Sequence, residues 1–139
     1  MNSFRLLDEA DFTCLQSLLD PDSLPRLNGE QRATLSAMLA ECAVSHDPLL
    51  LECRIGISDR ITLVSPQDSR DWYKPEIVLP PEADLDADKI SALTPMALAV
   101  MGRRIGERVS WETPAGERVM TITKIAKQTQ EPVVAGSAL

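Results

Sequence analysis

The spacing of apolar residues changes near residue 48 from a helical period to alternation, and this change constrains the fold more than any other feature. Before it, apolar side chains recur every three or four positions, which is typical of amphipathic helices. After it, apolar and polar residues alternate, which is typical of strands with one buried face. Helices followed by strands predict an α+β fold, with a short antiparallel helical hairpin and then an antiparallel sheet. The helical stripes are Phe12, Leu15, Leu18 and Leu19, and then Leu35, Met38, Leu39 and Cys42.

Residues that cap or break helices mark the ends of this hairpin. Asp8 and Asn28 each precede an apolar stripe, and their side chains can accept hydrogen bonds from the exposed amides of a first helical turn. Gln31 lies three residues after Asn28, as in a capping box. Pro21 ends the first helix, because proline disfavours the helical conformation of the residue before it. We expect residues 1–46 to form a short helical arm.

Strands and turns follow over residues 47–127, which we expect to form the main domain. Proline and charged residues interrupt the middle of this region, so no long helix fits there. The expected strands are a hairpin of 51–57 with 61–64, a short strand at 76–79, and a terminal hairpin of 108–112 with 119–125. Residues 128–139 have no apolar pattern, and we expect them to form a flexible tail.

One short apolar helix is expected inside this domain. Thr94 can cap it, and Pro95 fits its first turn because proline gives up no hydrogen bond at that position. Gly102 is a natural stop, since glycine readily adopts the left-handed conformation that ends many helices. The residues between them, PMALAVM, are apolar on all sides. We therefore expect this helix to be buried.

The acidic character of the chain excludes some partners. The formal net charge is −7, from 21 acidic and 14 basic residues, and phosphate backbones repel an acidic protein, so direct binding to free DNA or RNA is not expected. The three cysteines have no zinc or redox spacing. The start of the chain does not resemble a signal peptide, and no apolar stretch is long enough to span a bilayer. We expect a cytoplasmic protein with free thiols, no cofactor, no metal and no membrane association.

Residues 90–125, ISALTPMALAVMGRRIGERVSWETPAGERVMTITKI, resemble the C-terminal domain of the GreA/GreB transcription factors. That family has a strand ending in Ile-Ser, a Ser-Pro helix start, an Ala-Leu-x-Gly helix end, a Gly-x-x-Val strand and a Thr-Pro-x-Gly-Glu hairpin. The resemblance implies an FKBP-like fold that docks on RNA polymerase near its secondary channel. It implies RNA polymerase as the partner, and a regulatory protein in place of an enzyme.

Departures from the Gre pattern make the layout more similar to Rnk, the regulator of nucleoside diphosphate kinase, which resembles Gre factors but has a shorter helical arm. The arm of this chain is shorter than a Gre coiled coil, since helices of about a dozen residues reach only about 20 Å. Leu93 stands where Gre factors place an acidic residue before the Ser-Pro step, and Thr94 replaces the serine. Ala97 replaces the usual glycine after the helix start.

Two groups of residues are candidates for function. Asp20 and Asp22, in the connection between the arm helices, could share a magnesium ion, which prefers oxygen ligands, or could simply shape a turn. The second group follows from the resemblance and would contact the partner through the helix start and the helix end. Its arginines could also complement the negative end of the helix dipole. This group is Ser91, Leu93, Thr94, Pro95, Arg103 and Arg104.

Three functions are open at this point. We favour a Rnk-like regulator that modulates elongation, or competes with Gre factors, without catalysis of its own. The second is a Gre-like stimulator of transcript cleavage that uses Asp20 and Asp22 at the polymerase active site. The third, a peptidyl-prolyl isomerase, follows from an FKBP-like fold alone and needs an aromatic-lined pocket, whereas 4% of the residues are aromatic. The sequence leaves the oligomeric state open.

Overall fold

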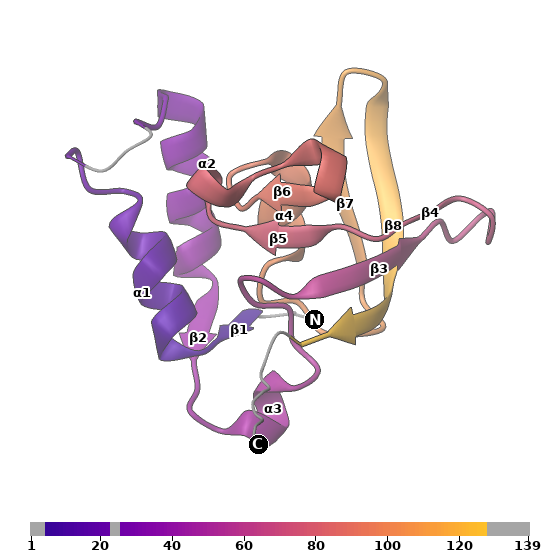
Figure 1. The fold of residues 1–139 in the computed structure, drawn as a ribbon, viewed down its shortest axis with the longest axis horizontal. Coiled ribbons are helices and arrows are strands. Elements are labelled where there is room, and N and C mark those ends of the chain that lie inside the picture. The colour runs from indigo at the N-terminus through magenta and orange to yellow at the C-terminus, as the bar shows by residue number, and fades with distance from the viewer. Residues whose placement is uncertain (1–4, 23–25, 128–139) are drawn as a thin grey trace.

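A curled sheet lies against one short helix, and a helical hairpin stands beside this pair (Figure 1). The computed structural model describes residues 5–22 and 26–127, so the predicted tail at 128–139 lies outside the described residues. The helices are α1 (Glu9–Ser17), α2 (Gly29–Ala40), α3 (Pro48–Leu51) and α4 (Pro95–Val100). The strands are β1 (Arg5–Leu7), β2 (Cys42–Val44), β3 (Arg60–Val64), β4 (Trp72–Tyr73), β5 (Glu76–Val78), β6 (Lys89–Ser91), β7 (Arg108–Thr113) and β8 (Gly116–Ala126). This mixture confirms the predicted α+β class.

The caps of the hairpin helices match the sequence prediction. The carboxylate of Asp8 accepts a hydrogen bond from the Asp11 amide at 2.7 Å and begins α1. A capping box begins α2, in which the side chain of Asn28 accepts from the Gln31 amide and the side chain of Gln31 accepts from the Asn28 amide. The two helices run antiparallel in Figure 1, which confirms the predicted hairpin.

A pair of short strands at the base of the hairpin was not predicted. β1 precedes α1 and β2 follows α2, and the two strands pair in parallel over three residues each. Cys42, expected on the stripe of α2, belongs to β2 instead. The Leu6 amide of β1 donates to the carbonyl of Gly102 at 3.0 Å. The base of the hairpin is therefore attached directly to the end of α4.

The main sheet has the strand order β6-β5-β3-β8-β7, and β4 pairs with β3 beside this path. Most neighbours are antiparallel, as predicted, but β5 and β6 run parallel, which corrects the expectation of a wholly antiparallel sheet. A parallel pair cannot be joined by a tight turn. Here the acidic segment of residues 79–88 provides the crossover through two short 3-10 turns, Pro80–Glu82 and Leu85–Ala87.

The strand predicted at 51–57 is wrong, and so is its hairpin with β3. Pro48 occupies the first turn of α3, and the side chain of Asp47 caps that helix, so a helical turn ends at Leu51, where the strand was expected to begin. After α3 the chain bends, and the Ile55 amide donates to the carbonyl of Arg103 at 3.0 Å. β3 pairs instead with β4, β5 and β8.

The predicted helix at the centre of the domain is confirmed. The Ala97 amide donates to Oγ1 of Thr94 at 3.2 Å, which caps α4. Gly102 follows the helix with a φ of +76°, and a Cβ added there would lie 3.0 Å from Cβ of Arg5 and 3.2 Å from the Leu6 nitrogen. Glycine is needed at this position both for its backbone conformation and for the close approach of β1.

The hairpin shares its core with the sheet. Leu15 of α1 and Leu35 of α2 are fully buried in the same cluster as Ile61 of β3 and Ile122 of β8. The helices therefore do not extend away from the domain as a free arm. The division into an arm at 1–46 and a domain at 47–127 stays a prediction made from the sequence.

Candidate functional site

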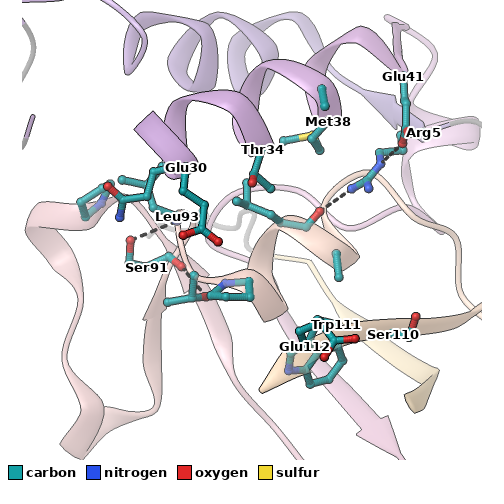
Figure 2. Close-up of a pocket in the computed structure, with 17 residues that line it drawn as sticks. Arg5, Glu30, Thr34, Met38, Glu41, Ser91, Leu93, Ser110, Trp111 and Glu112 are labelled. Atoms are coloured by element: carbon teal, nitrogen blue, oxygen red, sulfur yellow. Dashed lines mark hydrogen bonds and ion pairs between the residues drawn. The ribbon is translucent and has the colours of Figure 1, made fainter. Parts of the chain in front are cut away.

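A groove of about 830 Å³ lies between the hairpin and the sheet domain (Figure 2). α2 forms one wall, and α4 with the turn before it forms the other, while β7 closes one side. The apolar side chains along the groove include Met38, Leu93, Leu98 and Trp111. Concave apolar surfaces of this size commonly receive a ligand or the side chains of a partner.

All four residues predicted at the helix start line this groove: Ser91, Leu93, Thr94 and Pro95. Ser91 shapes their turn, because its Oγ accepts from the Leu93 amide at 3.1 Å and its carbonyl accepts from the Thr94 hydroxyl at 3.0 Å. Pro95 remains exposed, whereas Leu93 is almost buried. The structure thus brings the four residues together on one wall.

The charges along the groove are mainly negative. Glu30 on α2 and Glu112 on β7 are exposed. Glu41 is paired with Arg5, the one arginine along the groove, through a 2.9 Å hydrogen bond from Nε. Burial lowers the pKa of the Arg5 guanidinium, although its hydrogen bond to Glu41 opposes this shift. Because Arg5 is only 8% exposed, the free rim of the groove favours cationic groups.

Arg5 is an important residue that the sequence patterns missed. Besides Glu41, its guanidinium bonds the carbonyls of Leu98 and Met101 through Nη1. Carbonyls in the last turn of a helix have no partner within the helix, so Arg5 completes the end of α4. The signal in the sequence was an arginine directly before two leucines, in a segment too short to predict as a strand.

The two predicted arginines at the helix end do not line the groove. Nη2 of Arg103 lies 3.6 Å from Oε1 of Glu41, and its Nη1 lies 3.9 Å from Oε1 of Glu107. The side chain of Arg104 is exposed, and its amide donates to Oε2 of Glu107 at 2.8 Å. Arg103 is therefore engaged within the protein, whereas the side chain of Arg104 is accessible to a partner.

Asp20 and Asp22 form a local turn in the structure. Oδ1 of Asp20 accepts from the Asp22 amide at 2.9 Å, and both residues are exposed. Aspartate favours such turns for this reason. Within residues 5–22 and 26–127, no group of three or more His, Cys, Asp or Glu side chains is arranged to hold a metal ion. The geometry accounts for the turn, and a metal-binding role stays a prediction.

A second hollow of about 400 Å³ adjoins the groove. Tyr73, Met96 and Trp111 line it, and Thr94 and Pro95 contribute to both hollows. The start of α4 is thus bordered by concave surface on two sides.

The chain is similar in sequence to transcription elongation factors. The family model for the transcription elongation factor GreA/GreB C-terminal domain matches residues 52–127. The chain is 31% identical over 93 residues to transcription elongation factor GreA from Magnetococcus marinus, covering 67% of this chain and 59% of that protein. It is also 31% identical over 100 residues to GreA from Sphingopyxis alaskensis, covering 70% and 62%. The chain therefore spans about three fifths of the length of these relatives.

A solved structure supports the same fold. The prokaryotic transcription elongation factor GreA/GreB from Nitrosomonas europaea superposes with a TM-score of 0.71 at 21% identity, covering 91% of this chain and 100% of that chain. At this identity the likeness concerns the fold, whereas the family model covers more than half of the 139 residues. The chain therefore belongs, through its C-terminal domain, to the GreA/GreB family of transcription elongation factors.

Proposed function

We propose that this protein is a Rnk-like transcription regulator that binds RNA polymerase near the secondary channel. It would modulate elongation, or compete with Gre factors, without cleaving RNA itself. The observation that carries the proposal is a GreA/GreB C-terminal domain joined to two short helices that pack back onto it. A protein with this partner would act in the cytoplasm. No helix within residues 5–22 and 26–127 is both long and apolar enough to cross a bilayer.

The length of the hairpin supports regulation over cleavage. α1 has nine residues and α2 has twelve, so at 1.5 Å per residue the longer helix spans only about 18 Å. Both helices also bury residues against the sheet domain, which shortens their reach further. A hairpin of this kind can occupy the mouth of a channel without reaching a distant active site.

The groove beside α4 is the docking surface in this proposal. Ser91, Leu93, Thr94 and Pro95 present a fixed turn there, and Arg104 is exposed at the other end of the helix. The apolar wall would receive side chains of the polymerase, and the carboxylates at the rim would favour a basic polymerase surface.

The exposed position of Asp20 and Asp22 supports a second candidate, the stimulation of transcript cleavage. In that function the two carboxylates would help to hold a magnesium ion of the polymerase. The aromatic residues Tyr73 and Trp111 at the smaller hollow are the feature that an isomerase would use, and we rank that activity last because a fold does not by itself confer a function.

Binding to core RNA polymerase tests the proposal directly. We expect immobilised core polymerase to retain the protein and excess GreA to displace it. The double variant Glu30→Lys, Glu112→Lys should weaken binding about tenfold through charge reversal at the rim. The matched variant Glu82→Lys, Asp86→Lys changes the net charge equally on an exposed loop and should bind like wild type. Failure of the wild-type protein to bind at low salt would overturn the proposal.

A cleavage assay on backtracked elongation complexes separates the two candidates. If the protein is a regulator, it should not increase the rate of RNA cleavage. It should also inhibit the cleavage that GreA stimulates. An increased rate that is lost in the Asp20→Asn, Asp22→Asn variant would instead establish the second candidate.

A further inference from the structure

A carboxylate on the hairpin bonds to the sheet domain outside the groove. Asp11, in the first turn of α1, is half-buried, and its Oδ2 accepts from the Ile57 amide at 3.1 Å. These two residues are far apart in sequence, and their hydrogen bond joins α1 to the segment that leads into β3. The docking of α1 therefore depends in part on the state of this carboxyl group.

A second carboxylate lies close to the first. Asp59 is only 3% exposed, and its Oδ2 accepts from the Gly56 amide at 2.7 Å and from Nζ of Lys127 at 2.5 Å. Nζ of Lys127 also donates to the carbonyl of Arg54 at 2.8 Å. The ammonium group of Lys127 is thus held beside Asp59 by two hydrogen bonds.

Both carboxylates lie close to Gly56. A Cβ added to Gly56 would lie 2.4 Å from Oδ2 of Asp11 and 3.5 Å from Oδ2 of Asp59. A hollow of about 20 Å³ next to this point is lined by Asp8, Asp11, Arg54 and Lys127 among others. The charged groups that act on Asp11 are the carboxylates of Asp8 and Asp59 and the ammonium group of Lys127, whereas Nη1 of Arg54 is directed to the Gly102 carbonyl and to Glu107.

This environment disfavours the charged form of Asp11. The pKa of its carboxyl group is raised to about 6, mainly by burial and also by the neighbouring charges of Asp8 and Asp59, while the Ile57 amide and Lys127 act in the opposite direction. In the ionised form, Asp11 is repelled by two carboxylates within a poorly hydrated site. In the protonated form it keeps the hydrogen bond from Ile57 and loses the repulsion.

We propose that Asp11, held between Gly56, Asp59 and the start of α1, is a proton-operated latch that sets how firmly the hairpin is held on the domain. α1 packs on α2, and α2 is one wall of the groove beside α4. Protonation of the Asp11 oxygen that does not accept from Ile57 tightens the latch and narrows the groove. Ionisation loosens the hairpin and widens it. The effect on polymerase binding rests on the proposed function, whereas the latch itself does not.

Two probes can follow the latch without any partner. Trp111 lines the groove, and Trp72→Phe leaves it as the sole tryptophan of the chain. His46→Gln removes the sole histidine, so that it does not contribute to a pH titration. In this double variant, Trp111 fluorescence reports on the groove, and the ¹⁵N-labelled amide of Ile57 reports on its bond to Asp11.

We expect both probes to titrate together with a midpoint at about pH 6. Asp11→Asn preserves a side-chain acceptor for the Ile57 amide and should abolish both transitions. Asp22→Asn, a change at an exposed carboxylate of the same hairpin, should leave them in place. An Ile57 midpoint near pH 4, the ordinary range of aspartate, would overturn the proposal. A Trp111 signal that does not follow Ile57 would overturn its link to the groove.

The polymerase experiment stays separate from this one. If the latch is correct, Asp11→Asn should change the affinity for core polymerase at about pH 7.5 by about threefold or more. The comparison is made with the Trp72→Phe, His46→Gln variant, with and without Asp11→Asn. Loss of all polymerase binding, with the two titrations intact, would refute the proposed function and leave the latch standing.

Discussion

Nε of Arg5 lies 2.9 Å from Oε1 of Glu41, and Nη2 of Arg103 approaches the same oxygen at 3.6 Å. Arg5 belongs to β1, Glu41 follows α2, and Arg103 follows α4. One carboxylate therefore joins three segments at the base of the hairpin. The side chain of Arg5 is 10% exposed, and that of Glu41 is 54% exposed, so the two partners should contribute unequally to stability.

Replacement of Arg5 tests this inequality. Arg5→Met should lower the free energy of unfolding by about 2–4 kcal/mol, because the carbonyls of Leu98 and Met101 lose a buried donor. Glu41→Gln should cost only about 1 kcal/mol, since the amide oxygen can still accept and water reaches the site. Urea denaturation followed by circular dichroism measures both. Equal losses would show that the ion pair, and not the completion of α4, is the main contribution.

Gly102 should be the least replaceable of the glycines with positive φ. Gly102→Ala should cost about 2–3 kcal/mol, because a strained backbone angle is combined with contact against β1. Gly106 also has a positive φ, +94°, but a Cβ there meets nothing within 4 Å, so Gly106→Ala should cost only about 1 kcal/mol. Thermal and urea unfolding of the two variants separate the free-energy cost of the steric contact with β1 from the cost of the backbone conformation. A similar cost at both positions would contradict the close approach.

The cap of α4 should depend on the hydroxyl of Thr94. Thr94→Ala should destabilise the protein by about 1 kcal/mol, because the Ala97 amide loses its acceptor. Thr94→Ser keeps the hydroxyl and should cost a few tenths of a kcal/mol at most. Hydrogen exchange at Ala97 reports the loss locally, and a protected Ala97 amide in the alanine variant would argue against the cap.

The stability of the protein should depend on pH through Asp11. Its pKa is about 6 when folded and 3.8 in the reference state, so the folded protein binds more protons between these values. This contribution is complete below the lower value and is lost as the pH rises through about 6. After allowance for solvent screening we expect it to be on the order of 1 kcal/mol.

Urea denaturation at several pH values, with wild type and Asp11→Asn compared in the His46→Gln background, measures this dependence. The difference in unfolding free energy between the two proteins should change between about pH 4 and about pH 7. A constant difference over that range would mean that Asp11 has an ordinary pKa.

Local signals in the sequence predicted the helices well, because caps and stops act within a few residues. Asp8, Asn28 and Thr94 each cap the helix they were expected to cap. The strand at 51–57 was mispredicted because apolar and polar residues can also alternate in turns, and this segment follows directly on the helical turn that Pro48 starts. β1 and β2 have three residues each, which is too short for any periodic signal.

Only one wall of the candidate site could be predicted from the sequence. The turn from Ser91 to Pro95 could be found, because its residues are contiguous and resemble a family pattern. The opposite wall, with Glu30 and Met38 on α2, depends on how the hairpin packs on α4. Arg5 and Asp11 act across the chain on Met101 and Ile57. Such contacts arise from tertiary packing, so no local sequence pattern predicts them.

The parallel pairing of β1 with β2 brings the start and the end of the hairpin to one place on the domain. The length of the hairpin can therefore vary without a change in the sheet domain. Helical turns could be added at the end of α1 and the start of α2 without moving β1, β2 or the sheet. Lineages that lengthen or shorten this hairpin would change its reach while keeping the same domain, so the two parts can evolve at different rates.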